Sequence, residues 1–200
     1  MSKDWTGNTN SIFKTIGASN HTDKERQAED YYATSPEAID KLLSTGVKLS
    51  KRVWECACGE GHLSKRLEEY GYSVLSTDLI DRGYGTGDTD FLNCSEEWDG
   101  DIITNPPYKA SLQFCKKALD LVENGRKVFM FLKLTFLEGI ERQKFFLENP
   151  PKAVYVFSKR ILCAKNALFE EMKAGGGLAV AYAWFEWEKG YKGEPVIKWI

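Results

Sequence analysis

The segment Lys127–Leu134, with the sequence KVFMFLKL, is apolar on both faces except at Lys133. Such a strand is typical of the centre of a parallel sheet that is covered by helices on each side. Further strands are expected at Arg52–Ala57, Ser73–Thr77, Asp101–Thr104, Ala153–Phe157 and Leu178–Trp187, and helices at 35–46, His62–Tyr70, Ser111–Glu123 and Glu138–Leu147. Pro195–Ile200 is expected to pair back as a final, antiparallel strand. This alternation predicts a three-layer α/β fold with a mostly parallel sheet.

Composition narrows the class of protein. The 200 residues carry a net charge of −2, which disfavours a protein that wraps duplex DNA without preference. No run of 18 apolar residues predicts a membrane span, and the first residues lack the apolar segment of a secretory signal. Five cysteines, an odd number, indicate free thiols in a reducing, cytoplasmic compartment. Residues 1–29 are polar and are expected to form a flexible arm before a single domain at 30–200.

Charge is unevenly distributed along the chain. Residues 77–101 hold eight acidic residues and one basic residue, Arg82, whereas residues 142–169 hold six basic residues and one acidic residue. Two differently solvated faces would explain this pattern. An acidic pocket with a basic rim that recruits a polyanion would explain it equally well.

Three strand tails carry residues suited to ligand binding, and in parallel sheets ligands bind beyond the carboxyl ends of the strands. The first tail is Glu55–Gly61, where Gly59 and Gly61 allow a tight turn close to a ligand. Its G-x-G spacing lacks the third glycine of a dinucleotide fingerprint. The second tail ends at Asp78, whose carboxylate suits the two hydroxyl groups of a ribose.

The third tail is Asn105-Pro106-Pro107-Tyr108. Two prolines make this loop rigid, so that the Asn105 side-chain oxygen and the Pro106 carbonyl can point at one spot. Two such acceptors can take both hydrogens of a planar amino group and free its nitrogen lone pair for attack. The Tyr108 ring offers a stacking face for the base or amide that carries the amine.

These segments resemble a known family. The chain is similar to class I S-adenosylmethionine-dependent methyltransferases with an NPPY motif, above all to small adenine-N6 DNA methyltransferases of phages and prophages. The segments that carry the similarity are Asp30–Pro36, Glu55–Gly61, Asp78, Asp90–Leu92, Asn105–Tyr108 and the Tyr182–Trp184 region. The resemblance implies a Rossmann-like fold with a seven-stranded sheet. It also implies direct displacement of the methyl group from sulfonium to nitrogen, with no metal ion.

The resemblance assigns roles to individual residues. Tyr32 and Thr34 would flank the methionine end of the cofactor. Its other contacts would be Glu55, Ala57, Cys58, Gly59 and Gly61 for the amino-acid portion, Asp78 and Leu79 for the ribose and adenine, Asp90 and Phe91 for the adenine, and Asn105 beside the reacting centre. Asn105 and Pro106 would bind the target amine, Pro107 would stiffen the loop, and Tyr108 would stack on the target.

The acceptor is expected to be adenine in DNA, flipped out of the duplex. The candidate substrate contacts are Lys133, Phe157, Lys159, Arg160 and Lys165. Phe169 is a second candidate, besides Phe157, for an aromatic ring that stacks on the flipped base. Lys133 could instead extend its ammonium group into solvent. RNA adenine and a protein glutamine amide are alternative acceptors, and a non-catalytic cofactor-binding protein is a third reading. The chain is expected to lack a separate target-recognition domain, and a monomer or a homodimer is expected.

Overall fold

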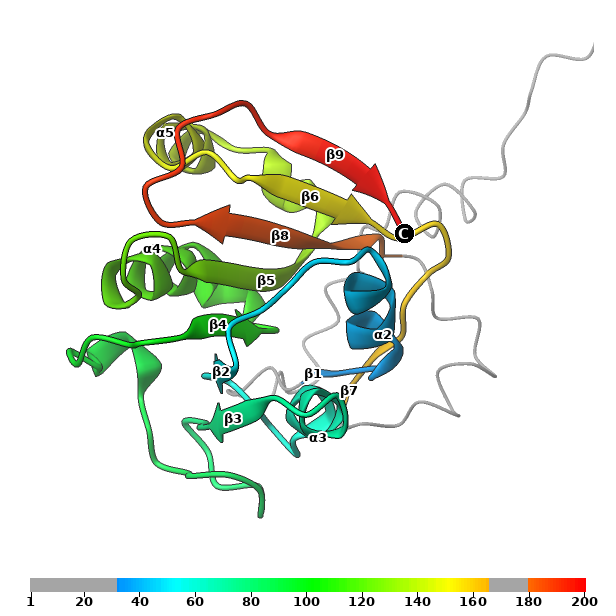
Figure 1. Cartoon of the computed structure of the whole chain (residues 1–200), viewed down its shortest axis with the longest axis vertical. Coiled ribbons are helices and arrows are strands. Elements are labelled where there is room, and N and C mark those ends of the chain that lie inside the picture. The colour runs from blue at the N-terminus through cyan, green and yellow to red at the C-terminus, as the bar shows by residue number, and fades with distance from the viewer. Residues whose placement is uncertain (1–31, 166–179) are drawn as a thin grey trace, which may run out of the picture.

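One seven-stranded sheet organises the computed structural model, which describes residues 32–165 and 180–200 (Figure 1). In spatial order its strands are β3 (Ser73–Ser76), β2 (Arg52–Glu55), β4 (Asp101–Thr104), β5 (Lys127–Lys133), β8 (Tyr182–Glu188), β6 (Ala153–Val156) and β9 (Val196–Trp199). All neighbours are parallel except β8, which is antiparallel to both β5 and β6. The predicted mostly parallel α/β fold is therefore confirmed.

Helices cover both faces of this sheet. Helices α4 (Ser111–Leu121) and α5 (Ile140–Glu148) pack on one face, in a core that includes Trp187. Helices α2 (Glu37–Ser44) and α3 (His62–Glu69) pack on the other face, in a core that includes Trp184. Alternate residues of β5 enter the two cores, which is why this strand is apolar on both sides.

The last strand pairs differently from the expectation. Pro195–Ile200 was expected to pair back antiparallel on the preceding strand, but β9 lies beside β6 and runs parallel to it. Both edges of β8 are already occupied, by β5 and by β6, so β9 can join the sheet only at its outer edge.

A small second sheet was not predicted. Strand β1 (Tyr32–Thr34) pairs antiparallel with β7 (Cys163–Lys165), which joins two segments about 130 residues apart. This sheet lies next to α2 and α3 in Figure 1. It brings Tyr32 and Cys163 to the carboxyl edge of the large sheet, beside Asn105.

Three 3₁₀ helices complete the described chain: η1 (Phe91–Asn93), η2 (Tyr108–Ala110) and η3 (Leu134–Leu137). In the part of the chain that the structure describes, no helix combines the length and the apolar character needed to cross a membrane. The polar arm expected at 1–29 and the candidate aromatic Phe169 lie outside the described residues.

Candidate active site

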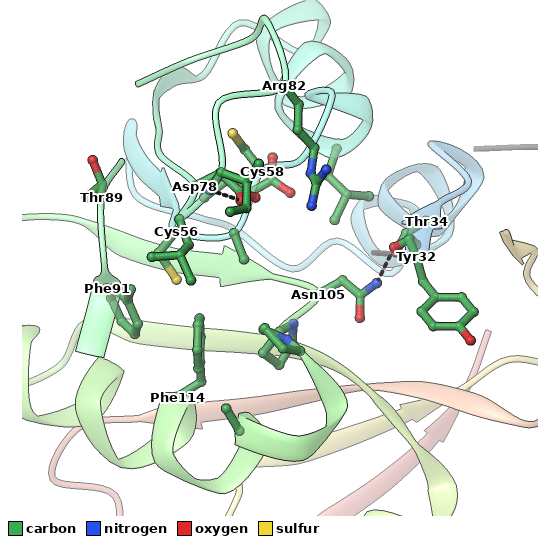
Figure 2. Close-up of a pocket in the computed structure, with 18 of the residues that line it drawn as sticks. Tyr32, Thr34, Cys56, Cys58, Asp78, Arg82, Thr89, Phe91, Asn105 and Phe114 are labelled. Carbon is green, nitrogen blue, oxygen red and sulfur yellow. Dashed lines mark hydrogen bonds between the residues drawn. The ribbon is translucent and has the colours of Figure 1, made fainter. Parts of the chain in front are cut away.

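A cavity of about 360 Å³ lies where the three strand tails meet (Figure 2). Its size is within the range usual for small-molecule sites. Most residues that the sequence assigned to the cofactor and the amine line it: Tyr32, Thr34, Glu55, Ala57, Cys58, Asp78, Leu79, Asp90, Phe91, Asn105, Pro106, Pro107 and Tyr108. Strand order explains the convergence, because β2, β3 and β4 are adjacent and parallel.

Gly59 and Gly61 shape the loop after β2 without lining the cavity. Both have positive φ angles, +55° and +77°, which glycine adopts without strain. The Gly59 N–H donates to the Asp78 carboxylate at 2.8 Å, which ties the first two strand tails together. The Tyr84 ring packs against Gly61 so closely that a Cβ there would lie 2.2 Å from ring carbons.

Glu55 ends β2 as a buried carboxyl group. Its side chain accepts a hydrogen bond from the Ser64 hydroxyl, which in turn accepts one from Ser76 at 2.8 Å. Burial, with a smaller contribution from the Asp78 charge, raises the pKa of Glu55 to about 8. The group is therefore neutral near pH 7, and a cation that entered the cavity would favour its ionised form.

The part of the cavity wall formed by Phe91 and Phe114 is apolar. Phe91 is buried against Trp54 and Phe114, with ring centroids 5.2 and 5.0 Å away. Asp90 caps the 3₁₀ helix η1: its carboxylate accepts from the Leu92 N–H at 3.0 Å and from the Asn93 amide at 2.7 Å. Phe91 and Phe114 thus form an apolar slot in the cavity wall, and together with the neighbouring Asp90 carboxylate it suits an aromatic ring that carries an amino group.

Asn105 has a fixed orientation. Its amide nitrogen donates to the Tyr32 backbone carbonyl at 2.9 Å and contacts the Cys163 sulfur at 3.6 Å. A carbonyl oxygen only accepts hydrogen bonds, so the amide cannot flip without losing this bond. The Asn105 Oδ1 is thereby held at the cavity, buried and with no hydrogen-bond partner among the described residues (Figure 2).

Tyr108 is surrounded by polar and aromatic groups. Its hydroxyl hydrogen-bonds the Tyr182 hydroxyl at 2.9 Å and the Cys163 thiol at 3.1 Å. The Lys133 ammonium lies 4.2 Å from its ring centroid, and the Tyr32 ring lies 5.5 Å away. Burial raises the pKa of Tyr108. A base that stacks on this ring therefore has to replace one of these neighbours.

The remaining substrate candidates differ in position. Phe157 packs on the Phe131 ring at 5.9 Å, and Lys159 and Arg160 are exposed just after β6. The carboxyl end of β6 is at the same edge of the sheet as Asn105, because β5 and β6 both run antiparallel to β8. The backbone of Lys165 is in β7, but its side chain lies outside the described part of the chain.

Neither the acidic stretch 77–101 nor the basic stretch 142–169 occupies a single face of the protein. Lys144 pairs with Glu141 at 2.8 Å, and Lys152 pairs with Glu188 at the amino edge of the sheet. Asp101 is also at that edge, where it accepts backbone hydrogen bonds from Ser50 and Lys127. The charge runs therefore combine residues of both edges, and only some of them face the cavity.

Cys163, Tyr182 and Arg82 are among the residues at or near the cavity to which the sequence assigned no role. Cys163 and Tyr182 reach Tyr108 from segments whose pairing the sequence does not reveal. Arg82 lines the cavity as the single basic residue of the acidic run. All five cysteines are free thiols, as expected. No group of three or more His, Cys, Asp or Glu within the described ranges could hold a metal ion.

No protein-family model matches the chain, and no curated protein matches its sequence. Solved structures do share its fold. A protein assigned as the modification subunit of a type I restriction enzyme from Vibrio vulnificus YJ016 aligns over 88% of this chain and 48% of its own, with 12% identity and a TM-score of 0.55. A protein assigned as a class I S-adenosylmethionine-dependent methyltransferase from Listeria monocytogenes aligns over 83% and 65%, with 14% identity and a TM-score of 0.56.

A third structure, of a protein assigned as a hemolysin from Lactococcus lactis, aligns over 82% of this chain and 90% of its own, with 12% identity and a TM-score of 0.58. The chain thus spans about half of the Vibrio protein and 65% of the Listeria protein. At these identities the likeness concerns the fold, which is the Rossmann-like fold of class I methyltransferases. Function has to be argued from the site.

Proposed function

We propose that the protein is an S-adenosylmethionine-dependent methyltransferase that acts on the N6 amino group of adenine in DNA. The observation that carries this proposal is the Asn105 Oδ1, a buried acceptor held at the cavity with no described partner. A buried acceptor without a hydrogen bond is costly, and a donor on a bound ligand would remove that cost. The N–H of an amine is the donor that this position can accept.

The groups that line the cavity also fit the parts of the cofactor. Glu55, buried and neutral near pH 7, can bind and become ionised by the ammonium group of the methionine portion. Asp78 retains lone pairs for ribose hydroxyls besides its bonds from Gly59 and Ile80. The apolar slot at Phe91 can hold the adenine, with Asp90 beside its amino group. When bound, this cofactor supplies an activated methyl group.

The chain's own residues prepare the acceptor. Asn105 draws one amine hydrogen toward its Oδ1, and Pro106, buried next to it, offers its carbonyl for the other. Tyr108 is rigidly held for stacking, and entry of a base displaces the Lys133 ammonium toward the rim. Positioning of this kind supplies most of the rate in a single displacement.

A nucleic acid is favoured as the acceptor by the charges around the opening. Lys109 lines the cavity on the Tyr108 side, Lys133 covers Tyr108, and Lys159 and Arg160 are exposed at the same edge of the sheet. These four cations suit a phosphate backbone. The likeness in fold to a restriction-modification subunit supports DNA in particular.

The test is transfer of label from S-adenosylmethionine into duplex DNA, single-stranded DNA, RNA and lysate protein. We expect N6-methyladenine in DNA, lost in Asn105→Ala and retained in Asn124→Ala, a matched change at an exposed position. Label in RNA or protein alone would replace the proposed acceptor. Cofactor binding without label in any pool would leave a binding protein and contradict the proposed activity.

A further inference from the structure

The loop after β3 closes on itself beside the cavity. At its base, the Asp78 N–H donates to the Thr86 carbonyl at 3.0 Å, and the Thr86 N–H donates to the Ser76 carbonyl at 2.9 Å. The Thr89 N–H donates to the Asp78 carbonyl at 2.9 Å. These bonds hold residues 78–89 as a closed loop with Arg82 near its tip.

Tyr84 anchors this tip to the glycine loop. Its ring packs on Gly61, and the Lys65 ammonium lies 4.7 Å from the ring centroid. Its carbonyl accepts a hydrogen bond from the Cys58 thiol at 3.7 Å. Because Tyr84 is only two residues from Arg82, these contacts restrict where the Arg82 side chain can reach.

Arg82 reaches the cavity at a definite end. Figure 2 shows its guanidinium group directed into the cavity between the Cys58–Asp78 side and the Thr34–Asn105 side, away from the apolar slot. Burial raises the pKa of the Cys58 thiol, and the positive charge of Arg82 lowers it by a smaller amount. A guanidinium group in this position presents several donors in a fixed plane.

The surrounding charges indicate which anion it can take. Glu55, Asp78 and Asp90 also line the cavity, so a polyanion such as a phosphate chain would meet several carboxyl groups there. A ligand with one carboxylate next to an ammonium group would avoid this repulsion, because its ammonium group would face Glu55. An α-amino acid end therefore matches the Glu55 and Arg82 pair.

We infer that Arg82 binds the carboxylate of the amino-acid portion of the cofactor while Glu55 binds its ammonium group. This inference rests on the proposed function, since it assigns one contact within the same cavity. Arg82 is then a cofactor-binding residue that selects ligands with a carboxylate. Guanidinium and carboxylate groups form paired, charge-assisted hydrogen bonds, which makes such a contact selective as well as strong.

Isothermal titration with two ligands tests this contact: S-adenosylhomocysteine and its decarboxylated analogue, which differ only in the carboxylate. We expect the wild-type chain to prefer the carboxylate-bearing ligand by about 10- to 100-fold. Arg82→Gln should lose that preference by weakening S-adenosylhomocysteine alone, and Arg82→Lys should restore part of it. Thermal unfolding of the variants reports on folding.

The possible failures are distinguishable. If Arg82→Gln weakens both ligands equally, Arg82 only supports the loop, and the inference is wrong while the cofactor proposal stands. If the variant binds S-adenosylhomocysteine as the wild type does, another group holds the carboxylate, and the inference is again wrong. If the wild-type chain binds neither ligand, the proposed function fails and this contact with it.

Discussion

The side-chain amide of Asn105 donates a hydrogen bond to the backbone carbonyl of Tyr32, at 2.9 Å and across 73 positions of the sequence. Tyr32 begins β1, whose pairing with β7 fixes the direction of that carbonyl. The peptide group of Tyr32 thus sets which way the Asn105 oxygen points. Through this bond, the small β1–β7 sheet orients the Asn105 Oδ1 at the cavity.

Asn105→Asp is expected to lower methyl transfer by about 100-fold or more, because small misplacements at a reacting centre have effects of that size. A carboxylate has no N–H for the Tyr32 carbonyl, and the two oxygens repel each other. Turnover under saturating cofactor measures the loss, with Asn124→Asp as the exposed control. More than half of the wild-type activity in Asn105→Asp would contradict this role for the amide.

Glu55 makes stability depend on pH in the absence of ligand. Its pKa is about 8 in the folded chain and close to 4.5 when unfolded, so between these values the folded state holds the extra proton. Raising the pH through this window therefore favours unfolding, by up to about 1.4 kcal/mol per pH unit. Glu55→Gln should remove this contribution. Urea unfolding from pH 5 to 8.5 measures it, and equal pH slopes for both proteins would refute it.

Much of the architecture could be predicted from the sequence because its signals are local. Short apolar runs with polar tails mark β2, β3 and β4, and the adjacency of these parallel strands then brings Glu55, Asp78 and Asn105 together. Those tails also explain why the observed strands end before the predicted ones: Cys56 and Ala57 belong to the site loop and not to β2.

What could not be predicted depends on contacts between distant segments. The sequence of β7 contains no strand signal of its own, and only its pairing with β1 places Cys163 next to Asn105 and Tyr108. The position of β9 likewise depends on which strand edges are free, a property of the assembled sheet. Burial of Glu55 follows from the packing of α3, since Ser64 on that helix supplies its hydrogen bond.

Gly61→Ala should destabilise the chain more than Gly46→Ala does. Both glycines have φ near +80°, which costs alanine about 1 kcal/mol. At Gly46 a Cβ has nothing within 4 Å, whereas at Gly61 it would overlap the Tyr84 ring. The added crowding should cost Gly61→Ala about 1–3 kcal/mol more in unfolding free energy. Similar losses in the two variants, measured by urea unfolding, would mean that Tyr84 moves aside easily.

Tyr155→Phe tests the sheet away from the cavity. The Tyr155 hydroxyl donates to the Glu186 carboxylate at 2.6 Å, and Glu186 is buried. Removing the donor should lower the unfolding free energy by about 1–3 kcal/mol, since it leaves a buried carboxylate without this bond. Adding Glu186→Leu to Tyr155→Phe should recover part of the loss. A double variant less stable than Tyr155→Phe alone would mean that Glu186 contributes through other contacts.

Salt dependence distinguishes two surfaces as sites for DNA: the edge of the sheet that carries Asn105 and the surface of α5. Lys159 and Arg160 follow β6 at the edge that carries Asn105, whereas Lys144 is paired with Glu141 on the surface of α5. Each phosphate contact contributes about 0.9 to the slope of log K against log salt, so Lys159→Gln with Arg160→Gln should reduce the slope by about 2. Lys144→Gln should leave it unchanged, because its ammonium already has a carboxylate partner and is on another surface. An equal reduction in both proteins would mean that DNA is held by general charge, and no reduction in either would exclude Lys159 and Arg160 from the interface.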